Sequence, residues 1–230
     1  MSNMLHGSTF FCMAISLFGY EAGIFLRKKL KIGIFNPLLV SIVFVIVVLK
    51  VTGIDYDTYD KGANVLSYLL TPSTVCLAIP LYQQMNLLKK NLKAIIAGIT
   101  TGVFASLAGV WVFSMLFHLK KQFYVTLLPK SITTAIGMGI SEELGGIVTI
   151  TVAVIIITGV LGNMIAEVVY KIAKIEEPIA RGLGLGTSAH AIGTAKAMEL
   201  GPVEGAMSSL AIAVAGLLTV IGASVFAGMM

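Results

Sequence analysis

The sequence predicts an all-α, polytopic membrane protein with about seven to eight transmembrane or re-entrant helical elements, including discontinuous helices. Hydrophobic residues make up 57% of the 230 residues and charged residues only 12%, whereas a soluble domain carries about 25% charged residues. The mean hydropathy is +0.95. Because a spanning helix needs about 20 apolar residues, residues 1–230 form a single transmembrane domain with no room for a soluble catalytic domain.

The charged residues support this class and argue against a nucleic-acid partner. The net charge is +5, but the Lys and Arg residues lie in short runs between apolar segments, as loop positions beside a membrane do. The expected surroundings are therefore membrane lipid. Cys12 and Cys76 lie within apolar runs, which argues against a disulfide framework.

The first two spans are predicted at residues 5–26 and 34–54. No basic region or cleavage site precedes the first run, so we interpret it as a span and not as a signal peptide. The basic cluster at residues 27–31 follows it, and the positive-inside tendency places this cluster in the cytoplasm. The second span opens at Asn36-Pro37, a favourable helix start, and leads into an acidic loop at residues 55–60 on the opposite side.

The third and fourth elements are predicted at residues 62–82 and 92–118. Pro72 and Pro80 lie inside the third element, so its helix must be kinked or broken. The fourth element is a longer helix with small residues at three- or four-residue spacing, which allows another helix to approach closely. These small residues are Gly98, Gly102, Ala105 and Gly109.

The second half of the chain contains four further elements. Residues 122–139 include the helix breaker Pro129 and make a poor regular helix, and a re-entrant segment there keeps the later basic cluster on the cytoplasmic side. A clean apolar run covers residues 147–169, and Asn163 within it is expected to hydrogen-bond across helices. The seventh and eighth elements are residues 178–201 and 204–230.

Three interrupted elements carry the polar residues of the chain. If each one reaches across the bilayer, counting places Ser73, Ser131 and His190 near their midpoints. Irregular backbone at that depth is tolerated where it is buried in protein or lines a wet cavity, and transporters commonly bind their substrate there. Residues 71–74 also align with residues 187–190, which leaves two structural repeats as an open interpretation.

The segment GLGLGTSAHAIGTAKAMELG, residues 182–201, places His190, Lys196 and Glu199 among small residues. Its Gly186 and Gly193 are expected to break the helix. An imidazole there can contact a substrate or carry a coupled proton, although a packing histidine is the alternative. Lys196 and Glu199 are three residues apart and can simply pair with each other.

A second cation lies in the sequence LLPKSITT, residues 127–134. Lys130 follows a proline and precedes several hydroxyls, a pattern that favours contact with an anion, whereas a lysine that extends to water is the alternative. No nucleophile elbow, metal-binding or phosphate-binding motif occurs, so neither an enzyme nor a metal or other cofactor is predicted.

The motifs LLTPSTVCLAIPLYQQ, LLPKSITT, GTSAHAIGTAKAMELG and SSLAIAVAGLLT together resemble the LrgB/CidB membrane family over nearly the whole chain. This resemblance implies a multi-pass protein of the bacterial inner membrane, related to the plastid glycolate/glycerate translocator. Small monocarboxylates such as glycolate, glycerate, pyruvate and lactate are then the expected substrates. The family usually has Pro at Ala135 and Ser at Ala189, and both replacements leave the cation and the other hydroxyls in place.

We therefore expect a secondary carrier that binds a small carboxylate near the midplane and works by alternating access. The predicted cations are Lys130, His190 and Lys196, and the predicted hydroxyl ligands are Thr71, Ser131, Thr133, Thr134, Thr187, Ser188 and Thr194. His190 and Glu199 are the candidates for proton coupling. The rival hypothesis is a holin-like pore or a regulator of murein hydrolase activity. A homodimer is the default assembly, and the resemblance also implies a small holin-like membrane partner.

Overall fold

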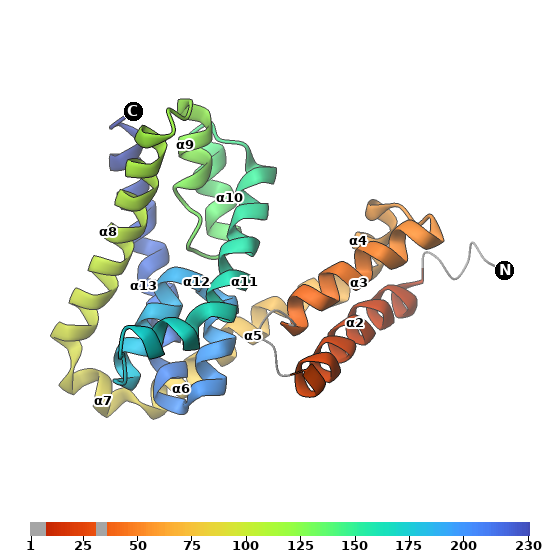
Figure 1. Cartoon of the computed structure of the whole chain (residues 1–230), viewed down its shortest axis with the longest axis horizontal. Helices are drawn as coiled ribbons and strands as arrows, with labels where there is room; N and C mark the ends of the chain where they lie inside the picture. Colours follow the sequence, from red (N-terminus) through yellow and green to blue (C-terminus); the bar gives the residue numbers. More distant parts are fainter. Residues whose placement is uncertain (1–7, 31–35) are drawn as a thin grey trace. The chain divides into compact units, whose positions relative to one another are not determined.

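The computed structural model describes residues 8–30 and 36–230, and in these ranges the chain consists of helices and turns without a strand. The all-α prediction is confirmed. The chain divides into two compact units, residues 1–76 and residues 77–230, which are described separately below. Figure 1 shows the helices in the order in which they follow along the chain.

The first unit is built on close packing of α2 against two later helices. Its helices are α2 (Thr9–Leu30), α3 (Pro37–Thr52), α4 (Tyr56–Tyr68) and α5 (Leu70–Cys76). At Gly23 of α2 a side-chain Cβ would clash with the backbone of Pro37, so glycine is needed for the approach of α3. Ser16 of α2 bonds both neighbours: its carbonyl accepts from Ser41 Oγ at 3.2 Å, and its hydroxyl lies 2.7 Å from the Tyr59 hydroxyl.

Local capping fixes the ends of α3 and α4. Asn36 accepts a hydrogen bond from the Leu38 amide at 2.9 Å, and Gly53 ends α3 with a φ of 69°. The predicted acidic loop at residues 55–60 is wrong, because Asp55 caps α4 by accepting from the Thr58 amide at 2.8 Å. Hydrogen bonds from the Thr58 hydroxyl and amide lower the pKa of Asp55.

The third predicted element is interrupted, as its prolines indicate. Residues 56–90 form the short helices α4, α5, α6 (Ala78–Gln83) and α7 (Met85–Lys90). The breaks fall at Leu69 and Leu77, and Pro72 and Pro80 are each the third residue of the helix that follows. A proline is tolerated there because the first amides of a helix have no intrahelical acceptor. The two prolines therefore lie just after the breaks.

The second unit contains three long helices and several shorter ones. They are α6, α7, α8 (Leu92–Leu116), α9 (Lys121–Leu127), α10 (Thr134–Glu143), α11 (Val148–Ile172), α12 (Pro178–Leu200) and α13 (Pro202–Ala227). Five helical stretches of the described residues are long and apolar enough to cross a membrane: α2, residues 56–83, α8, α11 and α13. The helix α12 is not among them.

Residues 121–143 form a helical hairpin, here called the first hairpin, in which α9 and α10 are joined by a turn at residues 128–133. The chain returns to α9 after α10, because the Thr126 hydroxyl accepts from the Ile147 amide at 2.8 Å and the Thr126 carbonyl accepts from Thr151 Oγ1 at 2.9 Å. The start of α11 therefore lies beside the end of α9. A segment that folds back in this way agrees with the re-entrant interpretation of residues 122–139.

The helix α12 is itself a hairpin, here called the second hairpin, with arms at residues 178–189 and 191–200. Its helical backbone is broken at His190, where φ is 43° and ψ is −135°. A Cβ at Gly193 would lie 2.6 Å from the Leu185 carbonyl oxygen, and Arg181 and Leu200 line one cavity. The two arms thus fold back on each other, and this segment does not cross the unit as its length suggested.

The expectation that Gly186 and Gly193 break the helix is also wrong. Both lie in helical backbone, and the break falls between them. A Cβ at Gly186 would lie 2.5 Å from the Ser208 carbonyl oxygen, so this glycine allows α13 to pack closely. Gly193 serves the contact between the two arms in the same way. Small residues at such contacts are typical of helix packing in membranes.

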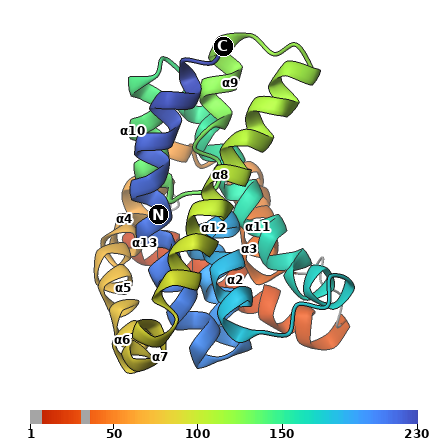
Figure 2. The ribbon, with the colours of Figure 1, turned by 90° about the vertical axis from the view of Figure 1, so that its left-hand side faces the viewer.

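The long helices α8, α11 and α13 each contact both hairpins. The α13 residues Ser208 and Phe226 illustrate this: Ser208 bonds Thr194 of the second hairpin at 2.7 Å, and the Phe226 carbonyl accepts from Tyr124 Oη of the first at 2.8 Å. In Figure 1, α9 and α10 occupy the upper part of the second unit and α12 its lower part. Figure 2 shows α8 and α13 running along the length of this unit.

This arrangement places two basic clusters at one end of the second unit. Asn91 at the start of α8 and Glu177 at the start of α12 line the same groove, so Lys89 to Lys93 and Lys171 to Lys174 lie near the same end. The hairpins enter from opposite ends, because the first begins where α8 ends. The position of both basic clusters at one end agrees with the excess of Lys and Arg that membrane proteins have on one side of the membrane.

Candidate functional site

The tips of the two hairpins contact neighbouring positions on α8. On α8, a Cβ at Gly102 would lie 2.9 Å from Thr187 Oγ1 of the second hairpin. Four residues later, Ser106 Oγ donates to Ser131 Oγ of the first hairpin at 3.0 Å. Four helical residues span about 6 Å, so the two tips lie within about one helical turn of each other.

Lys130 is held at the tip of the first hairpin. It is half-buried, and its Nζ donates to Ser131 Oγ at 2.9 Å. No carboxylate of the described residues forms an ion pair with it. Because Ser131 Oγ accepts from both Lys130 and Ser106, its own hydrogen remains to be donated. An uncompensated cation and a free hydroxyl donor therefore lie side by side.

The turn around Lys130 presents further donors. The Thr133 and Thr134 side chains are half-buried and make no hydrogen bond within the described residues. Thr133 is also the N-cap residue of α10, and its side chain does not cap the helix. The first amides of a helix have no intrahelical acceptor, and those of α10 have no side-chain cap either. Such a helix N-terminus attracts anions. The first-hairpin tip therefore combines a cation, three hydroxyls and a helix N-terminus.

His190 is at the tip of the second hairpin, and its ring is held by α11. The side chain is 4% exposed, and Nε2 lies 3.0 Å from the Ile155 carbonyl oxygen, a distance that makes Nε2 the protonated nitrogen in the neutral ring. On the same helix, Asn163 Nδ2 donates to the Ile192 carbonyl at 3.0 Å, which confirms the cross-helix bond predicted for it. These two bonds fix the tip of the second hairpin on α11.

Three predicted hydroxyl ligands donate their hydrogens within the protein. Thr187 Oγ1 donates to the Leu183 carbonyl at 2.8 Å, and Ser188 Oγ donates to the Gly184 carbonyl at 2.6 Å. Thr194 Oγ1 donates to the His190 carbonyl at 3.1 Å. A hydroxyl has a single hydrogen, so these three groups are poor donors to an anion. Thr71 lies exposed on α5 in the first unit.

Lys196 lies in the middle of the second arm, six residues beyond His190 at the tip. It is 5% exposed and forms ion pairs with Glu167 of α11 and, at 3.2 Å, with Glu199. Its charge is therefore already balanced by two carboxylates. Glu199 is nine residues from His190, about 13 Å along a helix, so the structure does not bring the two proton-coupling candidates together.

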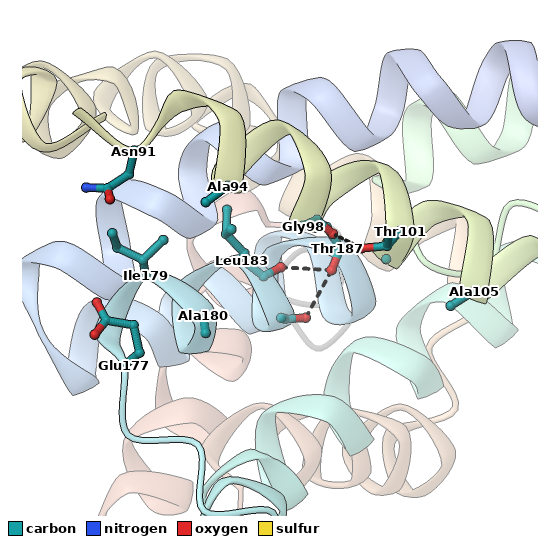
Figure 3. A pocket seen from close by; sticks show the side chains of 12 residues that line it. Asn91, Ala94, Gly98, Thr101, Ala105, Glu177, Ile179, Ala180, Leu183 and Thr187 are labelled. Carbon is teal, nitrogen blue, oxygen red and sulfur yellow. Dashed lines mark hydrogen bonds between the residues drawn. The ribbon is translucent and has the colours of Figure 1, made fainter. Parts of the chain in front are cut away.

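A groove of about 620 Å³ runs between α8 and the first arm of the second hairpin. Figure 3 shows Asn91 and Glu177 at one end of the groove, and Thr101 and Ala105 at the other. Thr187 is the one predicted site residue that lines it. Gly98 and Gly102 lie on its α8 wall, as the small-residue spacing indicated, whereas a Cβ at Gly109 would meet nothing within 4 Å.

Sequence reasoning missed four groups that complete these sites. Ser106 bonds the first-hairpin tip, the Ile155 carbonyl bonds the His190 ring, Ser208 bonds Thr194, and Glu167 pairs with Lys196. Ser106 follows Gly102 by four residues, so the small-residue face of α8 was the signal that could have found it. A backbone carbonyl such as that of Ile155 leaves no mark in the sequence.

The long apolar helices and the two opposed hairpins define a multi-pass membrane protein with a polar, cationic centre. The model of the LrgB-like family matches residues 16–229, and the chain belongs to this family. The antiholin-like protein LrgB of Bacillus subtilis (strain 168) is 38% identical over 220 residues, which cover 95% of this chain and 95% of that protein. No solved structure matches the chain.

Proposed function

We propose that this protein is a secondary carrier of small monocarboxylates in the bacterial inner membrane, with the anion bound at the tip of the first hairpin. The observation that carries the proposal is Lys130: this residue is half-buried at the tip of the first hairpin, its ammonium bonds Ser131 at 2.9 Å, and it has no carboxylate partner among the described residues. A buried cation without a counter-ion is costly, and a bound carboxylate would balance it.

The donor set favours a single carboxylate with a neighbouring oxygen. Lys130 and the Ser131 hydroxyl would bind the carboxylate oxygens, and Thr133 or Thr134 would bond a 2-hydroxy or 2-oxo group. Lys196 is already neutralised by two carboxylates, which leaves one uncompensated cation at the tips and supports a monoanion over a dicarboxylate. The family resemblance to the plastid glycolate/glycerate translocator supports the same substrate class.

The opposed hairpins also support alternating access. Discontinuous elements that meet within a bundle are typical of carriers, which move a substrate by shifting such elements around a central site. His190 would act here by holding the second hairpin on α11 through its bond with the Ile155 carbonyl. Proton coupling through this residue remains part of the proposal, because a protonated ring could still donate from Nε2.

Uptake of radiolabelled glycolate, lactate and pyruvate into proteoliposomes tests the site. A charge-assisted hydrogen bond contributes about 1.5–3 kcal/mol, so Lys130→Ala should weaken substrate affinity roughly 10- to 150-fold. Lys121→Ala is the matched control, because Lys121 lies exposed at the open end of the same hairpin. If folded Lys130→Ala transports with wild-type affinity, the proposed anion site is wrong.

A second candidate function follows from the name of the relative, an antiholin-like protein. Under this proposal the chain would regulate a holin-like membrane protein and murein hydrolase activity, as a homodimer or with a small partner. The two functions differ in flux: a carrier saturates and shows counterflow, whereas a pore passes unrelated dyes without saturation. Counterflow measured with a panel of carboxylates separates them.

A further inference from the structure

A cavity of about 390 Å³ lies at the turn between α11 and α12, away from the hairpin tips. Its polar lining comes from the last turns of α11, the turn itself and the first turn of α12. The polar residues are Glu167, Tyr170, Lys171, Lys174, Glu176 and Arg181. The proposed carrier site uses none of these residues, so the cavity is a separate feature of the second unit.

The charges that line this cavity are mainly positive and uncompensated. Glu167 is occupied by its ion pair with Lys196, which leaves Glu176 as the other acid of the lining. Three cations, Lys171, Lys174 and Arg181, have no carboxylate partner within the described residues. Three cations and two carboxylates give the lining a formal charge of +1, which an anion would balance.

Arg181 is oriented by contacts that leave the end of its guanidinium available. Its Nε donates to the Ile175 carbonyl at 2.8 Å, and its guanidinium carbon lies 5.8 Å from the centre of the Tyr170 ring. The Tyr170 hydroxyl in turn donates to the Arg181 carbonyl at 2.7 Å. Because Nε is used within the protein, the two terminal nitrogens can bind an anion with the paired geometry that arginine offers to phosphate.

Lys174 occupies a backbone position that glycine would fill at lower energy. It follows the end of α11 with a φ of 54°, and the Ile175 amide donates to the Tyr170 carbonyl at 2.8 Å. This bond is typical of a helix end closed by a left-handed residue, which is usually glycine. Backbone strain of this kind concentrates at functional sites, so the lysine at this position is consistent with a role for its side chain.

The cavity lies at the end of α11, one of the helices that are long and apolar enough to cross a membrane. Val168 and Ile172, in the last turns of α11, are 58% and 77% exposed, as lipid-facing side chains are. Tyrosines concentrate at the membrane–water boundary, and Tyr170 lies between these two residues. Basic pockets between helices at this depth bind the phosphate headgroups of anionic lipids.

We infer that this cavity binds the phosphate headgroup of an anionic phospholipid through Arg181, Lys171 and Lys174. The inference does not depend on what the protein transports. The shared chemistry is a phosphate ester, so free phosphate must be separated from lipid in the test. Phosphatidylcholine has the same phosphate with a compensating cation and serves as the lipid control.

Native mass spectrometry of the purified full chain in detergent measures the binding of phosphatidylglycerol directly. Combining Lys171→Gln, Lys174→Gln and Arg181→Gln should reduce phosphatidylglycerol affinity at least tenfold and leave phosphatidylcholine adducts unchanged. The control combines Lys89→Gln, Lys90→Gln and Lys93→Gln, which removes the same charge from an exposed cluster that lines no described cavity. This control should bind phosphatidylglycerol like the wild type.

Lys174→Gly keeps the test valid if the triple variant fails to fold. Glycine suits the φ of 54°, so the variant should unfold in lipid-free detergent at the wild-type temperature or higher. The upward shift that phosphatidylglycerol causes should be smaller than in the wild type. Equal shifts in both proteins, loss of binding in the exposed-cluster control, or displacement of the lipid by millimolar inorganic phosphate would each overturn the lipid site.

Discussion

Replacing His190 by glycine should destabilise the protein less than replacing it by alanine. Both variants remove the imidazole and its 3.0 Å bond with the Ile155 carbonyl, so that loss cancels in the comparison. What differs is the backbone, which has a φ of 43° and a ψ of −135° at this residue. An L-residue in such a region costs about 1–3 kcal/mol, whereas glycine adopts it readily.

Glycine also raises the entropy of the unfolded chain, which offsets about 0.4–1 kcal/mol of this advantage. His190→Gly should therefore be more stable than His190→Ala by about 1–2 kcal/mol. For a chain of this length that difference corresponds to about 2–8 °C in the unfolding temperature. Thermal unfolding of the two variants in the same detergent measures it.

At a control position in the second arm, the glycine variant should be less stable than the protein with alanine. Ala195 is exposed in regular helix, so Ala195→Gly should lower stability by about 1 kcal/mol. If His190→Ala unfolds at the same temperature as His190→Gly, or higher, then residue 190 does not have a positive φ. The second hairpin would then have no break at this residue, and the reasoning would be refuted.

Further predictions concern packing, ion pairs and capping. Gly186→Ala should destabilise by about 1–3 kcal/mol through overpacking against α13, whereas Gly184→Ala, whose Cβ would meet only the Tyr170 hydroxyl at 3.7 Å, should stabilise by up to about 1 kcal/mol; equal shifts in unfolding temperature would contradict the helix contact. Glu167→Gln alone should lower the free energy of unfolding by about 1 kcal/mol, because Glu199 remains paired with Lys196, and the double variant with Glu199→Gln should lower it by about 3 kcal/mol. If thermal unfolding shows that the double variant loses only the sum of the two single losses, the two carboxylates do not share one ion pair. Asp55 has a lowered pKa, so its cap stabilises α4 fully when the pH is above the ordinary pKa of an aspartate, and this stabilisation is lost as the pH falls through the lowered pKa. The difference in unfolding temperature between the wild type and Asp55→Ala should therefore disappear at low pH, and a difference that stays constant with pH would show that the carboxylate does not cap.

Much of the candidate site follows from residue chemistry in the sequence. Lys130 stands out because a lysine between a proline and several hydroxyls in an apolar chain has few other uses, and the structure leaves it without a carboxylate partner in the described residues. The folding back of the first hairpin could be predicted because its segment is too short and irregular to cross a membrane as a regular helix. Asn163 could be predicted because a polar amide inside an apolar helix needs a partner.

The second hairpin shows where sequence reasoning failed. Residues 178–201 have the length of a crossing, and the glycines within them suggested the breaks. The structure instead reverses the chain at His190 and uses Gly186 and Gly193 for close packing. A glycine that breaks a helix and a glycine that admits a neighbouring helix look the same in a sequence, because the difference lies in what the missing Cβ would touch.

The sequence by itself determined that this protein is helical, lies in the membrane and keeps a cation among hydroxyls, because composition and local motifs decide those properties residue by residue. Only the tertiary structure decided which cations are available. It paired Lys196 with Glu167 from α11 and brought Ser106 of α8 to the Lys130 turn. Partners far apart in the chain are selected by helix packing, and no local pattern records that selection.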